Sequence, residues 1–192
     1  MPHFDSLIGF LDSRSFGTVW YWVVVIGTWS LTGRSVIGVP AEIVSRARSA
    51  VQADEGDSPV VLHLLDWVSL VVPQWQVGRR EGAAMLGVAA FALTSLAILG
   101  FRYRLELALA SFLLLLPWSV LFWLRLGLAR HLASVLAGAG AGEEAKPVAA
   151  MAAAVVRRMV IHRRLVTILS MVSVALTALL GAVWSAVHAN GF

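Results

Sequence analysis

The chain contains no cysteine, and only 14% of its 192 residues are charged. The lack of cysteine excludes disulfides, thiolate nucleophiles and cysteine-ligated zinc or iron–sulfur sites within the chain. Soluble domains usually carry about a quarter charged residues, so the shortage of charge excludes an ordinary cytosolic globule and a disordered tail. The 59% share of hydrophobic residues and the mean hydropathy of +0.81 instead indicate an integral membrane protein.

Lysine is almost absent as well: 14 of the 15 basic residues are arginine, and the net charge is +4. These arginines bracket apolar runs, which is typical of topology signals in membrane proteins. We therefore do not expect nucleic acid as a partner. The segment Met1–Ser13 lacks a basic stretch followed by an apolar core, so we expect no cleavable signal peptide.

Four apolar windows are long enough to cross a bilayer, which takes about 20 residues in a helix. Backbone polar groups in lipid must be satisfied internally, so each window is expected to be helical. We predict an all-α integral membrane protein with four transmembrane helices plus interfacial amphipathic helices. The expected crossings are residues 15–33, 82–101, 105–124 and 165–188, with tails 1–14 and 189–192 and connections 34–81 and 125–164.

A fifth apolar stretch, Val60–Val77, has His63 and Asp66 at its centre and Pro73 further on. An aspartate in the middle of a transmembrane helix costs about 2.5–3.5 kcal/mol on insertion scales. A helix that lies in the membrane interface avoids that cost. We therefore predict that this stretch is interfacial.

The distribution of basic residues predicts the orientation. The connections 34–81 and 125–164 together carry 12 of the 15 basic residues, and only Arg14, Arg102 and Arg104 lie on the other side. By the positive-inside rule, both connections are expected in the cytoplasm of a bacterial cell. Both termini are then expected on the periplasmic side of the inner membrane.

Small residues recur every four positions in the fourth expected crossing, where they would let another helix approach closely. Such a face serves either packing within this chain or docking to another membrane subunit. Aromatic residues at the outer end of the first crossing would add to a docking surface. The weaker small-residue pattern of the second crossing is expected to pack internally. The candidate docking residues are Ser173, Thr177, Gly181, Ser185, Trp20 and Trp22.

No ionisable residue lies deep inside any of the four windows, which argues against an ion-coupled carrier or pump. Glu106 lies one turn after Arg102, and we expect the two to form a surface ion pair. A haem or pigment would need a histidine that faces the bundle, and His188 is a weak candidate for such a cofactor-binding role. We expect no cofactor and no metal.

His63 and Asp66 are three residues apart and share one helix face, with Ser69 or Ser58 nearby, so a hydrolase relay can be drawn from them. The chain has no glycine-flanked nucleophile and no metal-binding motif to support it. We therefore predict no catalytic residue and interpret these side chains as facing the lipid headgroups.

Clustered arginines could also bind anionic phospholipids, because each basic charge near the membrane surface contributes about 1 kcal/mol. The expected headgroup-binding residues are Arg125, Arg157, Arg158, Arg163 and Arg164.

Three short segments of the first 50 residues are similar to a group of small alphaproteobacterial inner-membrane proteins. The segments are Arg14-Ser-Phe-Gly-Thr-Val-Trp-Tyr-Trp22, Val36-Ile-Gly-Val-Pro40 and Glu42-Ile-Val-x-Arg46-Ala-Arg48. Members of that group are described as a component of the Suf iron–sulfur assembly complex. The resemblance implies a role in iron–sulfur assembly, although a chain without cysteine cannot ligate a cluster in the usual way.

Together these features favour a non-catalytic accessory subunit or assembly factor of a larger, energy-transducing complex of the inner membrane. Its expected partners are integral membrane subunits of that complex and anionic phospholipids. Two alternatives remain open: a small transporter or permease component, and a membrane-embedded enzyme that acts near His63 and Asp66.

Overall fold

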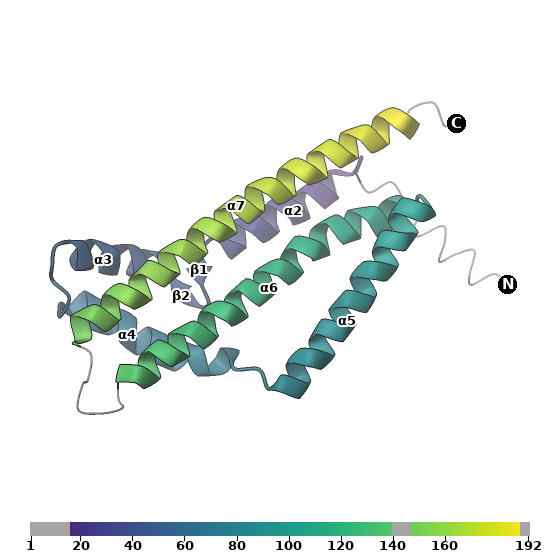
Figure 1. Ribbon diagram of the computed structural model, residues 1–192. Helices are drawn as coiled ribbons and strands as arrows, with labels where there is room; N and C mark the ends of the chain where they lie inside the picture. Colours follow the sequence, from purple (N-terminus) through teal and green to yellow (C-terminus); the bar gives the residue numbers. More distant parts are fainter. Residues whose placement is uncertain (1–15, 140–146, 189–192) are drawn as a thin grey trace. The chain divides into compact units, whose positions relative to one another are not determined.

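The computed structural model describes residues 16–139 and 147–188, and these are almost entirely helical (Figure 1). Besides turns and loops, the non-helical elements in these ranges are two strands of two residues each, so the prediction of a helical fold is confirmed. In chain order the elements are α2 (Val19–Thr32), β1 (Ser35–Val36), β2 (Val39–Pro40), α3 (Ala41–Gln52), α4 (Pro59–Val71), the 3-10 helix η1 (Val72–Trp75), α5 (Arg79–Ala97), the π-helix η2 (Ile98–Arg102), α6 (Glu106–Ala139) and α7 (Val148–His188).

Three helical stretches of the described chain are long and apolar enough to cross a membrane: Arg79–Arg102, Glu106–Gly138 and Val148–Val187. They contain the expected crossing 82–101 and all but one end residue of the expected crossings 105–124 and 165–188. The remaining one, residues 15–33, contains α2, which has only 14 helical residues. At 1.5 Å per residue α2 is about 21 Å long, which is less than the roughly 30 Å of a hydrocarbon core. The prediction of a helical membrane protein is therefore supported, whereas the predicted number of four crossings is not confirmed.

The chain forms two compact units. The described part of the first comprises residues 16–29, 79–120 and 168–188, and that of the second comprises residues 30–78, 121–139 and 147–167. The continuous helices α6 and α7 contribute residues to both units. No breaker interrupts α7, and α6 continues through Pro117.

The second unit has an apolar core built from the β-hairpin, α3, α4 and parts of α6 and α7. Helix α4 is amphipathic: one face is buried in this core, and His63 and Asp66 are exposed on the other face. The core residues of α4 recur at the three- and four-residue spacing of one helix face. The fully buried side chains of this unit include Ile37, Val39, Val44, Val61, Leu64, Val68, Leu132, Val155 and Met159.

A tight turn joins β1 to β2 and fixes the entry into α3. Its two central residues, Ile37 and Gly38, have φ values of 47° and 98°. A two-residue hairpin loop with positive φ at both positions has the twist that antiparallel strands need. The Ile37 side chain is 1% exposed, and a Cβ on Gly38 would lie 3.3 Å from the Val71 side chain. The turn is therefore packed against α4.

The first unit is held by contacts around Phe16, which packs with Leu109 and Ala110 of α6. The Phe16 amide donates a 2.6 Å hydrogen bond to the Glu106 carboxylate. Glu106 is only 8% exposed. The expected surface ion pair between Arg102 and Glu106 is therefore wrong: Glu106 lies in the interior, where a backbone donor from the segment before α2 replaces the arginine.

Helices α5 and α6 form the antiparallel hairpin that their short connection predicts. A Cβ on Gly100 of η2 would lie 2.8 Å from the Leu109 backbone, so only glycine allows this approach. The Phe101 and Phe112 rings also meet edge to face, with centroids 5.9 Å apart. Away from its connection to α6, helix α5 is almost fully exposed. Only 6% of its apolar window is buried by the rest of the chain.

Candidate functional site

The small-residue face of α7 lies mostly inside this chain. Ser173 and Thr177 are 8% and 2% exposed, and Gly181 is buried. A Cβ on Gly181 would lie 3.2 Å from the Phe16 ring, and the Thr177 side chain is hydrogen-bonded to Tyr21. Ser185, the last residue of the pattern, is exposed. This face therefore packs internally along most of its length, and its docking role stays a prediction.

The two tryptophans expected at the docking surface have different surroundings. Trp20 is 78% exposed. Trp22 is half-buried, and its indole N–H donates to the Phe16 carbonyl at 3.0 Å. Trp22 thus supports the start of α2, and only Trp20 is free to contact a partner or lipid.

Of the small residues of the second crossing that were expected to pack internally, the structure buries Gly82 and leaves Ala83 and Gly87 exposed. Within residues 79–102 the buried positions are Gly82 and Gly100. A Cβ on Gly87 would meet nothing within 4 Å. Five of the other small residues follow a spacing of four, three, four and three along α5, and Ala84, Ala89, Ala92 and Ser95 lie outside that spacing. The five are Ala83, Gly87, Ala90, Thr94 and Ala97, of which the first four are exposed.

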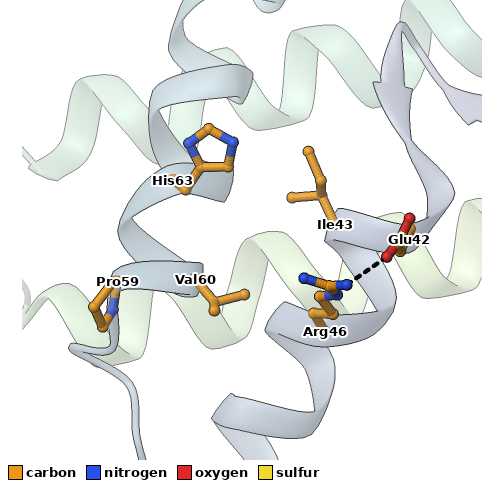
Figure 2. Close-up of a pocket in the computed structure, with 6 residues that line it drawn as sticks. All are labelled: Glu42, Ile43, Arg46, Pro59, Val60 and His63. Carbon is orange, nitrogen blue, oxygen red and sulfur yellow. Dashed lines mark hydrogen bonds and ion pairs between the residues drawn. The ribbon is translucent and has the colours of Figure 1, made fainter.

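An open groove of about 350 Å³ lies between α3 and α4 in the second unit (Figure 2). Ile43 and Val60 form its apolar part, with His63 at one side (Figure 2). The two charged residues on its wall neutralise each other, because the Arg46 guanidinium donates to the Glu42 carboxylate at 2.6 Å. The groove thus presents one histidine and no free charge.

The structure does not bring His63, Asp66 and Ser69 together as a hydrolase relay. The Trp67 indole N–H donates to Nε2 of His63 at 3.1 Å, so this nitrogen already has a partner. The Ser69 hydroxyl donates to the Asp66 backbone carbonyl at 2.7 Å. His63, Asp66 and Ser69 thus make separate local contacts. The described residues also include no group of three or more His, Asp and Glu that could hold a metal ion.

Among the predicted headgroup-binding arginines, four are exposed: Arg157, Arg158, Arg163 and Arg164. Arg125 is half-buried, with its guanidinium carbon 5.9 Å from the centre of the Trp75 ring, in the range of a cation–π contact. Its Nε atom is buried without a hydrogen-bond partner.

A second groove, of about 400 Å³, lies between α6 and α7 in the second unit. Four of its lining side chains carry N–H donors: Trp123, His131, Arg158 and His162. Both histidines lie in basic stretches of the sequence, beside Arg130 on α6 and Arg163 on α7. The signal that could have found them is their helix face. On each helix, lining residues lie three, four and seven positions after the first residue of the set, which places them on one face. The two sets are Leu124, Gly127, Leu128 and His131 on α6, and Arg158, Ile161, His162 and Leu165 on α7.

His188, the weak candidate for a cofactor ligand, is the last residue of α7. Its side chain lies outside the described part of the chain, so this role stays a prediction.

Comparison with known proteins adds no family. Neither protein-family models, nor curated proteins, nor solved structures give a match to the chain. Membership of the alphaproteobacterial group therefore stays a prediction.

Proposed function

We propose that this chain is a non-catalytic accessory subunit or assembly factor of a larger complex in the bacterial inner membrane. It would bind a second membrane-spanning subunit through α5. The observation that carries this proposal is that an apolar helix of membrane-spanning length is almost uncovered by its own chain, with 6% of its window buried.

Exposure alone suits lipid as well as protein, so the residue types on α5 matter. The exposed set that begins at Ala83 and ends at Ala97 has the heptad-like spacing of a helix–helix seam. Small residues at a seam let two backbones approach, and close packing drives helix association in lipid. The larger exposed side chains, such as Val88 at 71% and Phe91 at 76%, lie outside this set and suit lipid tails.

We further propose that the chain crosses the membrane four times, with both termini in the periplasm. The 14 residues of α2 would be extended to a crossing by apolar neighbours in the 15–33 window. The 12 basic residues of the two long connections would then all lie in the cytoplasm.

The docking proposal is tested by a bulky substitution at Gly87, where an added side chain meets open space in the isolated chain. Gly87→Leu should leave the purified chain as stable as the parent and abolish co-purification of the partner subunit from membranes in mild detergent. Val88→Phe is the matched control, since it adds bulk at an exposed position outside the small-residue set. Full retention of every co-purifying membrane protein by Gly87→Leu would contradict the proposal.

A further inference from the structure

The α6–α7 groove lies where two expected crossings end. Leu124 is the last residue of the third crossing and Leu165 is the first of the fourth, and both line the groove. Residues at the end of a membrane-spanning segment stand at the level of the lipid headgroups. This placement holds whichever side of the membrane the groove faces.

The polar side chains of the groove offer N–H donors. Among the described residues no aspartate or glutamate lines it, and Arg158 has no ion pair there. His162 is 5% exposed, and its side chain lines the groove. Buried polar groups in folded proteins normally have a hydrogen-bond partner. An acceptor from outside the chain, bound in the groove, would be such a partner for the imidazole N–H.

His162 lies on the buried face of α7. It follows Ala152, Val155 and Met159 on the face of α7 that is buried in the apolar core of the second unit. Arg125 of α6 interacts electrostatically with it and adds positive charge nearby. An interior position that could hold a leucine thus carries an imidazole. Arg125 and Arg158 are two basic residues near it.

The rest of the groove wall is apolar, with Trp123, Ile161 and Leu165 beside the basic groups. We propose that this groove binds one anionic phospholipid. Its phosphodiester would accept hydrogen bonds from Arg158, His162 and His131, and an acyl chain would lie along the apolar wall. Basic pockets between membrane helices are known to bind anionic headgroups, and Arg is well suited to phosphate oxygens. The apolar wall favours a lipid over a free phosphate ion.

The inference does not depend on docking through α5 and is tested with the full chain. The chain is reconstituted in phosphatidylcholine discs that contain a minor fraction of phosphatidylglycerol. It is then returned to detergent, and the lipid retained per chain is measured by mass spectrometry. We expect the parent to retain phosphatidylglycerol in preference to phosphatidylcholine, at one molecule per chain.

The decisive comparison is between two neighbouring arginines that are both exposed. Arg158→Gln should lower the retention of phosphatidylglycerol about fivefold, the loss of one headgroup contact. Arg157→Gln removes the same charge from a residue that does not line the groove and should leave retention unchanged. His162→Gln tests the buried donor, and the exposed Arg158 keeps the test valid if that variant does not fold.

Three results would overturn the proposal. Equal losses in the Arg157 and Arg158 variants would show that surface charge alone holds the lipid. Equal retention of phosphatidylcholine and phosphatidylglycerol would show that the headgroup is not recognised. Displacement of phosphatidylglycerol by millimolar inorganic phosphate, with phosphate retained in its place, would assign the groove to a soluble anion.

Discussion

The backbone amide of Phe16 and the carboxylate of Glu106 are joined by a 2.6 Å hydrogen bond across 90 positions of the chain. Glu106 opens α6, where a negative charge is also favoured by the helix dipole. The bond therefore fixes the segment that enters α2 to the first turn of a long apolar helix. It explains why a carboxylate occupies an interior position that the sequence placed at the surface.

Replacing Glu106 is expected to destabilise the first unit. Glu106→Ala leaves the Phe16 amide without its acceptor, which costs about 1–3 kcal/mol for a buried group. Glu106→Gln keeps an acceptor but loses its charge, and charge-assisted bonds are roughly twice as strong as neutral ones. We expect the Gln variant to lose about half as much stability as the Ala variant. Thermal unfolding of the chain in detergent measures both, and equal losses would contradict an acceptor role.

Gly181→Leu is expected to destabilise the chain itself. An added Cβ would lie 3.2 Å from the Phe16 ring, and a full leucine would displace that ring from its packing against α6. Overpacking of this kind costs about 1–3 kcal/mol. Gly27→Leu in α2 is the control, since a Cβ there meets nothing within 4 Å. A Gly181→Leu chain with parental thermal stability would show that the face is open to partners.

Gly38→Ala is expected to weaken the β-hairpin of the second unit. A φ of 98° disfavours any residue with a Cβ, and that Cβ would also lie 3.3 Å from the Val71 side chain. The left-handed conformation alone costs about 1–2 kcal/mol. Gly127→Ala in α6, where a Cβ meets open space, serves as the control. Loss of stability in the second variant but not in the first would contradict this account of the turn.

The sequence predicted the helical class and three of the long apolar helices because hydropathy and helix length follow directly from residue type. Pro147, which favours the first turn of a helix, also predicts a helix that begins there and continues into the last crossing, as α7 does. The length of α2 was not predictable in this way. An apolar window sets an upper limit to a helix, whereas the 14 residues observed depend on the turn that precedes Val19 and on the hairpin that follows Thr32.

The candidate sites were harder to predict because they depend on which faces meet. Small residues mark a face that can pack closely, but their spacing does not say whether the other helix belongs to the same chain. The structure covers Thr177 and Gly181 and leaves Gly87 open, the reverse of the expected order. His162 could not be predicted as a site residue for the same reason. Its place in a basic stretch does not show that its helix face is buried.

The arrangement of the chain in the membrane is tested most directly by labelling single cysteines, which its cysteine-free sequence makes straightforward. Ser13→Cys, Ala141→Cys and Asn190→Cys place one thiol in each tail and one in the second long connection. With a membrane-impermeant maleimide on spheroplasts, we expect labelling at positions 13 and 190, and at 141 only after the membrane is permeabilised. Labelling at 141 with protection at 190 would contradict four crossings with cytoplasmic arginine-rich connections.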